Sequence, residues 1–183
     1  MRPKLMTSNQ RKIAEFTRLG LDAEIGEPAP DLREALAEPL FVSAQKAFAC
    51  GAGSLCEDTR LDVEGAELGV LVKFGMEDLD KLQGRRARFA CCLALATESE
   101  VLVWEGAIDG VMGEARGPAG FGFDRHFHPD GAGGLSLSEL SAQGRKDDFS
   151  ARARACSLFK RAEPSKRFPL AELAAYEGPW QSD

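Results

Sequence analysis

Two adjacent carboxylates, Glu57 and Asp58, follow the short apolar stretch Ser54–Cys56 and precede Thr59. Carboxylate oxygens are the protein ligands that Mg²⁺ prefers, and the ion also keeps waters and phosphate oxygens as ligands. The pattern predicts a strand that ends at a polar tip able to hold a divalent cation. A solvated acidic turn uses the same residue types. Glu34, in an acidic loop, carries a weaker signal of the same kind.

An anion site is predicted where a short apolar stub, Lys4–Met6, meets a helical pattern. Thr7, Ser8 and Asn9 stand at this junction, and Lys12 lies one turn into the helix. A helix N-terminus presents unpaired N–H groups and a partial positive charge, so anions bind there readily. An Asn-capped helix with a solvated lysine is the plainer interpretation of the same residues.

Two phenylalanines among glycines, in Gly120-Phe121-Gly122-Phe123-Asp124, predict an aromatic contact with a planar ring. Glycine lets a ligand approach the backbone closely, and a phenylalanine ring can stack on a base. The alternative is that both rings belong to the core, because phenylalanine is usually buried.

Basic residues gather near a predicted helix start in the last third of the chain: Lys146, Arg152 and Arg154. They form either an anion patch or a solvated face. His126 and His128 would share one side of a strand, but no third soft ligand stands nearby, so a loop or surface role is favoured over a metal pair. The sequence has no P-loop, no Gly-x-Gly-x-x-Gly and no Ser-His-Asp order.

The composition is that of a soluble globular domain. The chain has 183 residues, of which 44% are hydrophobic and 28% charged, and its formal net charge is −6. A negative net charge argues against a protein that coats polymeric nucleic acid, although a local basic pocket for a small anion remains compatible with it. No apolar run reaches the ~18 residues of a transmembrane helix, so no membrane association is expected.

Cysteine usage indicates the compartment. The five cysteines are an odd number and include no Cys-x-x-Cys pair. A disulfide framework or zinc ribbon is therefore not expected. Buried, reduced thiols in a cytoplasmic protein are the simplest interpretation.

Helical and strand patterns alternate along the chain, which predicts the α/β class. Periodicity and capping residues predict the helices, and apolar runs bounded by turns predict the strands. The expected strands are residues 4–6, 54–56, 88–97 and 100–108, the last two as an antiparallel pair. The expected helices are residues 10–19, 41–50, 68–82, 150–160 and 170–176.

Taken in order, these segments resemble the inosine triphosphate pyrophosphatase family over about residues 4–160. Each motif is modest, but their joint order and spacing are specific. The matching residues are Thr7-Ser8-Asn9 with Lys12, Glu34, Gln45-Lys46, Glu57-Asp58-Thr59, Lys73-Phe74, Phe121-Gly122-Phe123-Asp124, Phe127, Pro129-Asp130-Gly131, Ser138-Glu139-Leu140, Lys146, Ser150 and Arg152.

The resemblance implies a single domain over residues 1–183, with 161–183 as a C-terminal extension that is helical in part. The implied fold is an elongated, curved mixed β-sheet with flanking helices in two lobes around a central cleft. It also implies a cytoplasmic homodimer. The implied reaction is the Mg²⁺-dependent hydrolysis of ITP, dITP or XTP to the monophosphate and pyrophosphate.

The resemblance also implies a role for each matching residue. Lys12 and Lys46 would compensate phosphate charge, Glu34 and Asp58 would hold the metal, and Asp58 would orient or deprotonate the attacking water. Arg152, which only donates hydrogen bonds, would favour a 6-oxo purine over adenine. The remaining substrate-binding residues would be Thr7, Ser8, Asn9, Thr59, Lys73, Phe121, Phe123, Asp124 and Lys146.

The chain departs from the family pattern mainly where a base would be read. Ala151 stands where the family has histidine, and Arg60 follows Thr59 where the family has a small residue. Arg125 and Asp147 replace a proline and an asparagine. Two alternatives therefore stay open: a hydrolase of the same fold with a different nucleotide or phosphometabolite substrate, and a non-catalytic nucleotide-binding protein.

Overall fold

Three long strands form the centre of a mixed β-sheet in the computed structural model, which describes residues 2–28, 34–69, 76–118 and 122–180. They are β3 (Ser54–Val63), β5 (Arg86–Ala96) and β6 (Glu100–Met112), and they are neighbours in the sheet. From Phe89 to Ala94 strand β5 is uncharged and entirely buried, as expected of a strand covered on both faces. The expected α/β class with a mixed sheet and flanking helices is confirmed.

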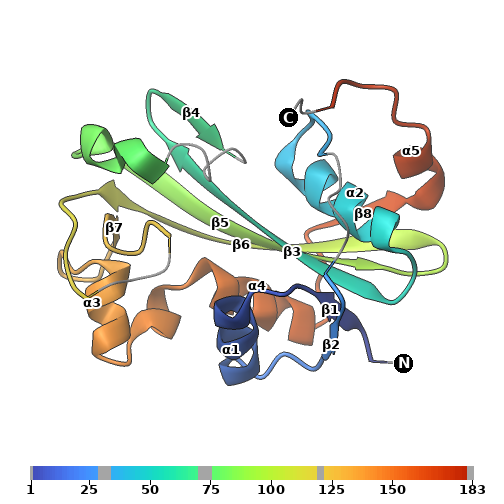
Figure 1. Ribbon diagram of the computed structural model, residues 1–183, viewed down its shortest axis with the longest axis horizontal. Helices are drawn as coiled ribbons and strands as arrows, with labels where there is room; N and C mark the ends of the chain where they lie inside the picture. Colours follow the sequence, from blue (N-terminus) through green and yellow to red (C-terminus); the bar gives the residue numbers. More distant parts are fainter. Residues whose placement is uncertain (1, 29–33, 70–75, 119–121, 181–183) are drawn as a thin grey trace. The chain divides into compact units, whose positions relative to one another are not determined.

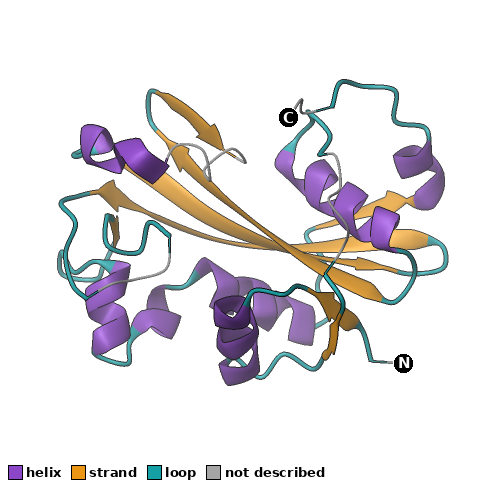
Figure 2. Ribbon diagram, viewed as in Figure 1, coloured by secondary structure: helices purple, strands orange, loops and turns teal. Residues whose placement is uncertain are grey.

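The other elements are shorter (Figure 2). The short strands are β1 (Lys4–Met6), β2 (Glu24–Gly26), β4 (Ala66–Gly69), β7 (Phe127–Pro129) and β8 (Lys166–Pro169). The helices are α1 (Gln10–Arg18), α2 (Pro39–Cys50), α3 (Leu137–Ala142), α4 (Ala151–Lys160) and α5 (Leu170–Ala174), with 3₁₀ turns η2 (Met76–Leu82) and η3 (Lys146–Phe149). The sheet order is β2-β1-β3-β5-β6-β7, with β4 paired to β3 and β8 paired to β6.

The chain divides into two compact units. The first contains residues 1–58, 92–105 and 155–183, and the second contains residues 59–91 and 106–154. Strands β3, β5 and β6 each contribute residues to both units.

In the first unit, β1 lies between two parallel neighbours, with Leu5 opposite Ile25 of β2 and Leu55 of β3. Helix α1 connects β1 to β2, and α2 connects β2 to β3 across β1. Because parallel crossovers are right-handed, two crossovers that run in opposite directions place their helices on opposite faces. Figure 1 shows this arrangement, with α2 on one side of these strands and α1 on the other.

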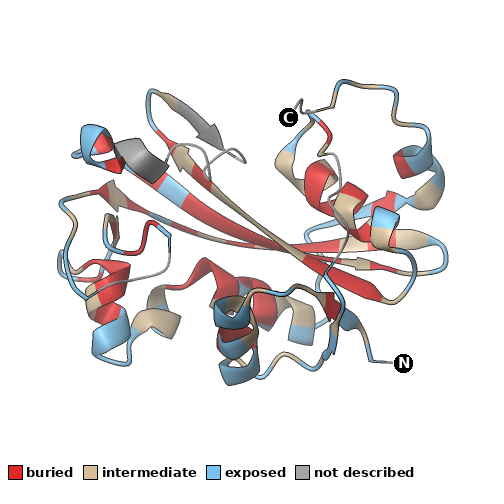
Figure 3. Ribbon diagram, viewed as in Figure 1, coloured by how far each residue is buried: buried red, intermediate tan, exposed pale blue. Residues whose placement is uncertain are grey.

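Strand β8 and helix α5 complete the first unit. β8 pairs antiparallel with the first residues of β6, Glu100–Val103, and α5 packs against α2. The core between these elements is apolar and buried (Figure 3). It contains Ala44, Ala47, Cys56, Cys92, Ala94, Ala96, Val101, Val103, Phe168 and Leu173.

The second unit has its own core of aromatic rings. Phe89 of β5 packs edge-to-face on Phe123 at a centroid distance of 4.9 Å and on Phe127 of β7 at 6.1 Å. Helix α3 begins with a capping box in which Ser136 and Glu139 exchange hydrogen bonds. Strand β7 pairs antiparallel with the end of β6.

Two expected boundaries are wrong. Strand β3 does not end at Cys56 but continues to Val63, because Leu61 and Val63 are buried beyond the polar residues. Glu57, Asp58 and Thr59 therefore lie within a strand and not at its tip. Residues 68–82 do not form one helix, since β4 extends to Gly69 and a 3₁₀ turn begins at Met76.

The other expected helices and strands are present to within a few residues, whereas β7, β8 and α3 were not expected. The five cysteines form no disulfide, and all but Cys50 are buried, as predicted. In the part of the chain that the structure describes, no helix is long and apolar enough to cross a bilayer.

Candidate functional site

The loop that follows β1 is shaped by its own side chains. The Asn9 N–H donates to Thr7 Oγ1 at 3.2 Å, and Asn9 Oδ1 accepts hydrogen bonds from the N–H groups of Arg11 at 3.0 Å and Lys12 at 3.3 Å. Ser8 is exposed between them. The structure thus confirms Asn9 as the N-cap of α1, and it places the positive end of that helix at the carboxyl end of β1.

Lys12 contacts Glu57, which the sequence predicted, together with Asp58, as a carboxylate able to hold a divalent cation. The Lys12 ammonium forms an ion pair with the Glu57 carboxylate, whose side chain is only 1% exposed. A buried carboxylate is tolerated when it is paired in this way. Because Glu57 and Asp58 are adjacent residues of a strand, their side chains point to opposite faces.

Lys46 joins two acidic side chains that are far apart in the sequence. Its Nζ atom lies 2.9 Å from Oε1 of Glu34 and 3.0 Å from Oδ1 of Asp58. All three side chains are about one-fifth exposed. The structure therefore brings together three of the four residues predicted to hold metal or compensate phosphate charge, while the fourth, Lys12, pairs with Glu57.

The Lys12–Glu57 and Lys46–Asp58 ion pairs lie on opposite faces of β3. Glu57 and Asp58 are successive strand residues, and their lysines come from α1 and α2, which cover opposite sides of the strands. Strand β1 ends at Met6, just past its pairing with Leu55, so this part of β3 extends beyond its neighbour. Ligands of open α/β sheets bind at such carboxyl ends, where the helices change sides.

Burial and neighbouring charges shift the protonation of the Lys46 cluster. Burial raises the pKa of Asp58 above 3.8, Lys46 opposes this rise, and Glu57 and Glu34 add to it. Burial alone lowers the pKa of Lys46, but Asp58 and Glu34 outweigh burial and leave that pKa above 10.5. The cluster thus combines a permanent cation with a carboxylate that accepts a proton more readily than an ordinary aspartate.

The donor set at this cluster fits a hard divalent cation. Glu34 and Asp58 each place an oxygen within 3.0 Å of one point, the Lys46 Nζ atom. Mg²⁺ typically uses one or two carboxylates and fills its other positions with waters and phosphates. The described residues contain no group of three or more His, Cys, Asp or Glu that could hold a metal by themselves. The set fits a metal that arrives with its phosphate ligand.

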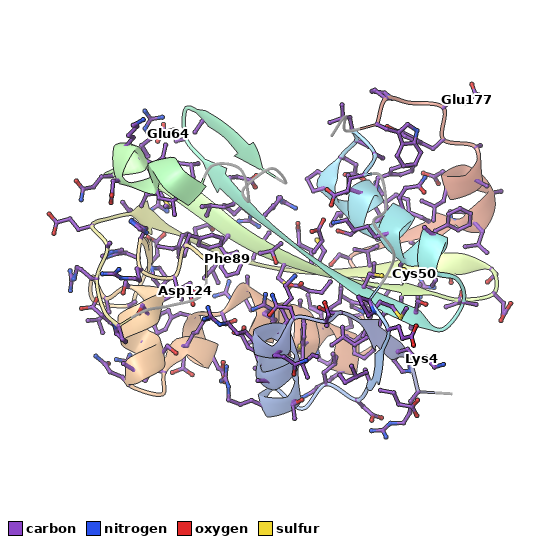
Figure 4. The ribbon with its side chains drawn as sticks, in the orientation of Figure 1. Lys4, Cys50, Glu64, Phe89, Asp124 and Glu177 are labelled. Carbon is purple, nitrogen blue, oxygen red and sulfur yellow. The ribbon has the colours of Figure 1, made fainter. Side chains whose placement is uncertain are left out.

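The surroundings of Cys56, two residues before Asp58, disfavour its thiolate form. Its thiol donates to Sγ of Cys50 at 3.6 Å. Cys50 is the last residue of α2 and is labelled in Figure 4. Burial and the neighbouring Cys50 raise the pKa of the Cys56 thiol. A protonated, buried thiol is inert.

In the second unit, Asp124 and Lys146 form a partly buried ion pair with 2.8 Å between Oδ2 and Nζ. Figure 4 labels Asp124 together with Phe89 in this part of the chain. Arg152, near the start of α4, is also buried, and so is the preceding Ala151. Three of the residues predicted to contact a nucleoside are thus charged groups that the fold encloses.

The remaining predicted residues differ in their placement. Phe123 is only 6% exposed and packs edge-to-face on Phe89, which favours its core interpretation over stacking on a base. Thr59 is half-buried on β3. Lys73 and Phe121 lie outside the described residues. Arg60 pairs with Asp62 on the same strand, with 2.9 Å between Nε and Oδ2.

Comparison with known proteins identifies relatives of nearly full length. The model of the Ham1 family matches residues 4–162. A dITP/XTP pyrophosphatase of Mycolicibacterium paratuberculosis is 30% identical over 86% of this chain and 94% of its own. An inosine triphosphate pyrophosphatase of Puccinia graminis f. sp. tritici is 29% identical over 82% of this chain and 90% of its own.

Solved structures match the fold. The Staphylococcus aureus Ham1 protein superposes with a TM-score of 0.71 at 23% identity, covering 88% of this chain and 97% of that one. A HAM1 protein from Coxiella burnetii gives the same TM-score of 0.71 and covers 98% of its own chain.

Proposed function

The chain belongs to the Ham1 family, and from this membership and the geometry of its site we propose that it is a nucleoside triphosphate pyrophosphatase. It hydrolyses deaminated purine nucleotides (ITP, dITP and XTP) to the monophosphate and pyrophosphate. The observation that carries the proposal is the Lys46 ammonium in contact with both Glu34 and Asp58. The relatives named above as pyrophosphatases of these nucleotides support the substrate class.

Phosphate binding is assigned to the carboxyl end of β1. The N-terminus of α1 supplies a partial positive charge there, and Lys12 and Lys46 supply full charges. The loop residues Thr7 and Ser8 are close to this helix start in the chain. A triphosphate carries enough negative charge to compete for both lysines with the carboxylates that they contact.

Glu34 and Asp58 are the residues that would hold Mg²⁺. When bound, the ion neutralises phosphate charge and activates the bond that breaks. Asp58 accepts a proton from the attacking water, and the burial that raises its pKa above that of an ordinary aspartate favours its protonated form. Lys46 keeps the two carboxylates close together and stabilises the charge that develops on the phosphate oxygens.

Base recognition is assigned to the second unit. Arg152 donates hydrogen bonds and accepts none, so it favours the 6-oxo group of hypoxanthine or xanthine over the 6-amino group of adenine. Asp124 and Lys146 are the partners that would bind the nucleoside, and stacking on the base remains a prediction for Phe121. Thr59 and Lys73 remain predicted substrate contacts.

A second candidate function, the same hydrolysis with another nucleotide or phosphometabolite, is favoured by one observation. Ala151 is 0% exposed at the position where the family has histidine, so the imidazole is replaced by a buried methyl group. A base pocket without that imidazole can accept other bases.

Assembly and compartment are part of the same proposal. We infer a cytoplasmic homodimer that acts on free nucleotides, with no polymeric nucleic acid or membrane as partner. The net charge of −6 agrees with the absence of a nucleic-acid partner. Sedimentation velocity at several protein concentrations measures the oligomeric state, and a monomer at all of them would contradict the dimer.

The deciding experiment is pyrophosphate release with Mg²⁺ from ITP, dITP, XTP, GTP, ATP and pyrimidine triphosphates. We expect release from ITP, dITP or XTP well above release from ATP. A stronger response to another nucleotide would support the second candidate. Nucleotide binding without release from any of them would indicate the non-catalytic alternative.

A further inference from the structure

The C-terminal segment 166–180 lies beyond the residues that the family model matches, yet it packs on the part of the first unit that carries Glu34 and Lys46. Its strand β8 pairs with β6, and its helix α5 packs against α2. Phe168 and Tyr176 both contact the ring of Phe41 on α2, at centroid distances of 5.6 and 5.1 Å. The segment is therefore a fixed part of this unit.

The segment holds the backbone next to Glu34. The Leu36 N–H donates to the Pro179 carbonyl at 2.8 Å, and Ala35 forms an isolated β-bridge with Trp180. The Tyr176 hydroxyl oxygen lies 2.7 Å from the Pro179 carbonyl oxygen and 3.2 Å from that of Leu36. Its single proton is shared between these two acceptors. The ring of Trp180 packs edge-to-face on that of Tyr176 at 5.3 Å.

This support matters because Glu34 itself lies outside every helix and strand. The described residues between Gly26 and Pro39 contain no helix or strand. A loop carboxylate is positioned only as well as its backbone is. The bridge to Trp180 begins at Ala35, one residue after the carboxylate that contacts Lys46.

The segment also holds the other partner of that ion pair. Gln45, next to Lys46 on α2, is buried, and its Nε2 atom donates to the Leu173 carbonyl of α5 at 2.7 Å. A buried amide with a single, well-placed acceptor fixes the rotation of its helix at that point. The same C-terminal segment thus accepts hydrogen bonds from Leu36, two residues after Glu34, and from Gln45, next to Lys46.

We propose that the C-terminal segment positions Glu34 and Lys46, two members of the cluster that also contains Asp58. Tyr176 and Gln45 are its positioning residues. Tyr176 sets the position of Glu34 through the Leu36–Pro179 contact, and Gln45 sets the position of Lys46. The kinetic part of this proposal rests on the proposed pyrophosphatase function, whereas the structural part does not.

Tyr176→Phe tests the Glu34 side, because it removes the hydroxyl and keeps the ring. We expect hydrogen exchange at the Leu36 amide, measured by NMR on the metal-free protein, to become about 2- to 10-fold faster. The Mg²⁺ concentration for half-maximal pyrophosphate release should rise by a similar factor of about 2- to 10-fold. Turnover at saturating Mg²⁺ should stay close to that of the wild type.

Gln45→Met tests the Lys46 side with a side chain of similar size. The KM for the nucleotide should rise about 2- to 10-fold, while exchange at the Leu36 amide stays at the wild-type rate. The matched control is Arg167→Gln, which removes an exposed ion pair with Glu100 from the same segment. The control should change neither the exchange rate, the Mg²⁺ dependence nor the KM.

Wild-type exchange at Leu36 in Tyr176→Phe would overturn the proposal. So would faster exchange with an unchanged Mg²⁺ dependence, since the contact would then be structural only. An equal effect of Arg167→Gln would also overturn it, by showing a general loosening of the segment. If the wild type releases no pyrophosphate, the proposed function fails, and the exchange rates alone decide whether the segment holds residues 35–36.

Discussion

At the scale of single residues, the chemistry depends on how one lysine is shared. Lys46 contacts Glu34 and Asp58 together, so the two carboxylates are held close without the full repulsion of like charges. Asp58 retains a raised pKa despite this cation, because its burial and the nearby acidic residues outweigh it. A group kept in an unfavourable charged state is often one that the protein uses.

Asp58→Asn should reduce turnover by about 10²- to 10⁴-fold, the usual contribution of a general base. The melting temperature should equal or exceed that of the wild type, because the substitution removes a charge that the fold disfavours. Asp62→Asn is the matched control on the same strand, and it should retain turnover. Near-normal turnover in Asp58→Asn would remove this residue from the mechanism.

Stability should depend on pH through the same group. The folded protein has the higher Asp58 pKa, so it binds more protons than the unfolded chain between pH 3.8 and that raised pKa. The contribution of Asp58 to stability is therefore lost as pH rises through this window. In urea unfolding from pH 4 to 8, the stability of Asp58→Asn relative to wild type should increase with pH. A constant or decreasing difference would contradict the raised pKa.

At the scale of elements, the position of each charged group follows from where β1 ends and where α1 and α2 begin. The sequence predicted these helices well, because Asn9 is a strong cap and glycines follow both. It misplaced the end of β3, because the polar residues 57–60 resemble a turn when read locally. Lysines from two helices pair with Glu57 and Asp58 within the strand, and only the tertiary structure reveals that pairing.

The residues of the candidate site were likewise predicted only in part from the sequence. Glu34, Lys46 and Asp58 were expected together from the order of motifs, and their side chains do meet. The Lys12–Glu57 pair and the contacts of Tyr176 and Gln45 were not expected, because they join residues far apart in the sequence without any local pattern. Phe123 could not be assigned to core or site from its glycine-rich context, since both roles use the same ring.

Asn9→Ala should lower stability and weaken nucleotide binding together. Loss of the cap costs about 0.5–2 kcal/mol, and the start of α1 loses the geometry assigned to phosphate binding. Ser136→Ala removes the corresponding cap of α3 and serves as the control. Unfolding curves should show comparable losses for both variants, whereas the KM for the nucleotide should rise only in Asn9→Ala. A parallel rise in both would point to general destabilisation.

At the scale of the whole chain, the two units carry different parts of the proposed task. The first contains the cluster assigned to phosphate and metal, and the second contains the enclosed charges assigned to the base. Three of the four departures from the family pattern adjoin the second set, at Arg125, Asp147 and Ala151. Rate and base selectivity should therefore respond to different substitutions.

Arg152→Met should lower kcat/KM for ITP by about 10- to 100-fold and affect ATP much less, because it removes donors to a 6-oxo group. Arg154→Met is the control: this exposed arginine of the same helix donates to the Ala107 carbonyl. Competition between ITP and ATP directly measures the ratio of their kcat/KM values. Equal losses for both nucleotides would assign Arg152 to folding or to phosphate binding.

The uneven burial of the thiols makes fluorescence labelling practical. Cys50 is half-buried at the end of α2, while the other four thiols are buried. A maleimide dye applied briefly to the native protein should attach once, at Cys50, and five times after denaturation. The dye would then sit one helical turn from Lys46 and change its emission when that helix moves, which gives a signal for nucleotide binding that requires no turnover.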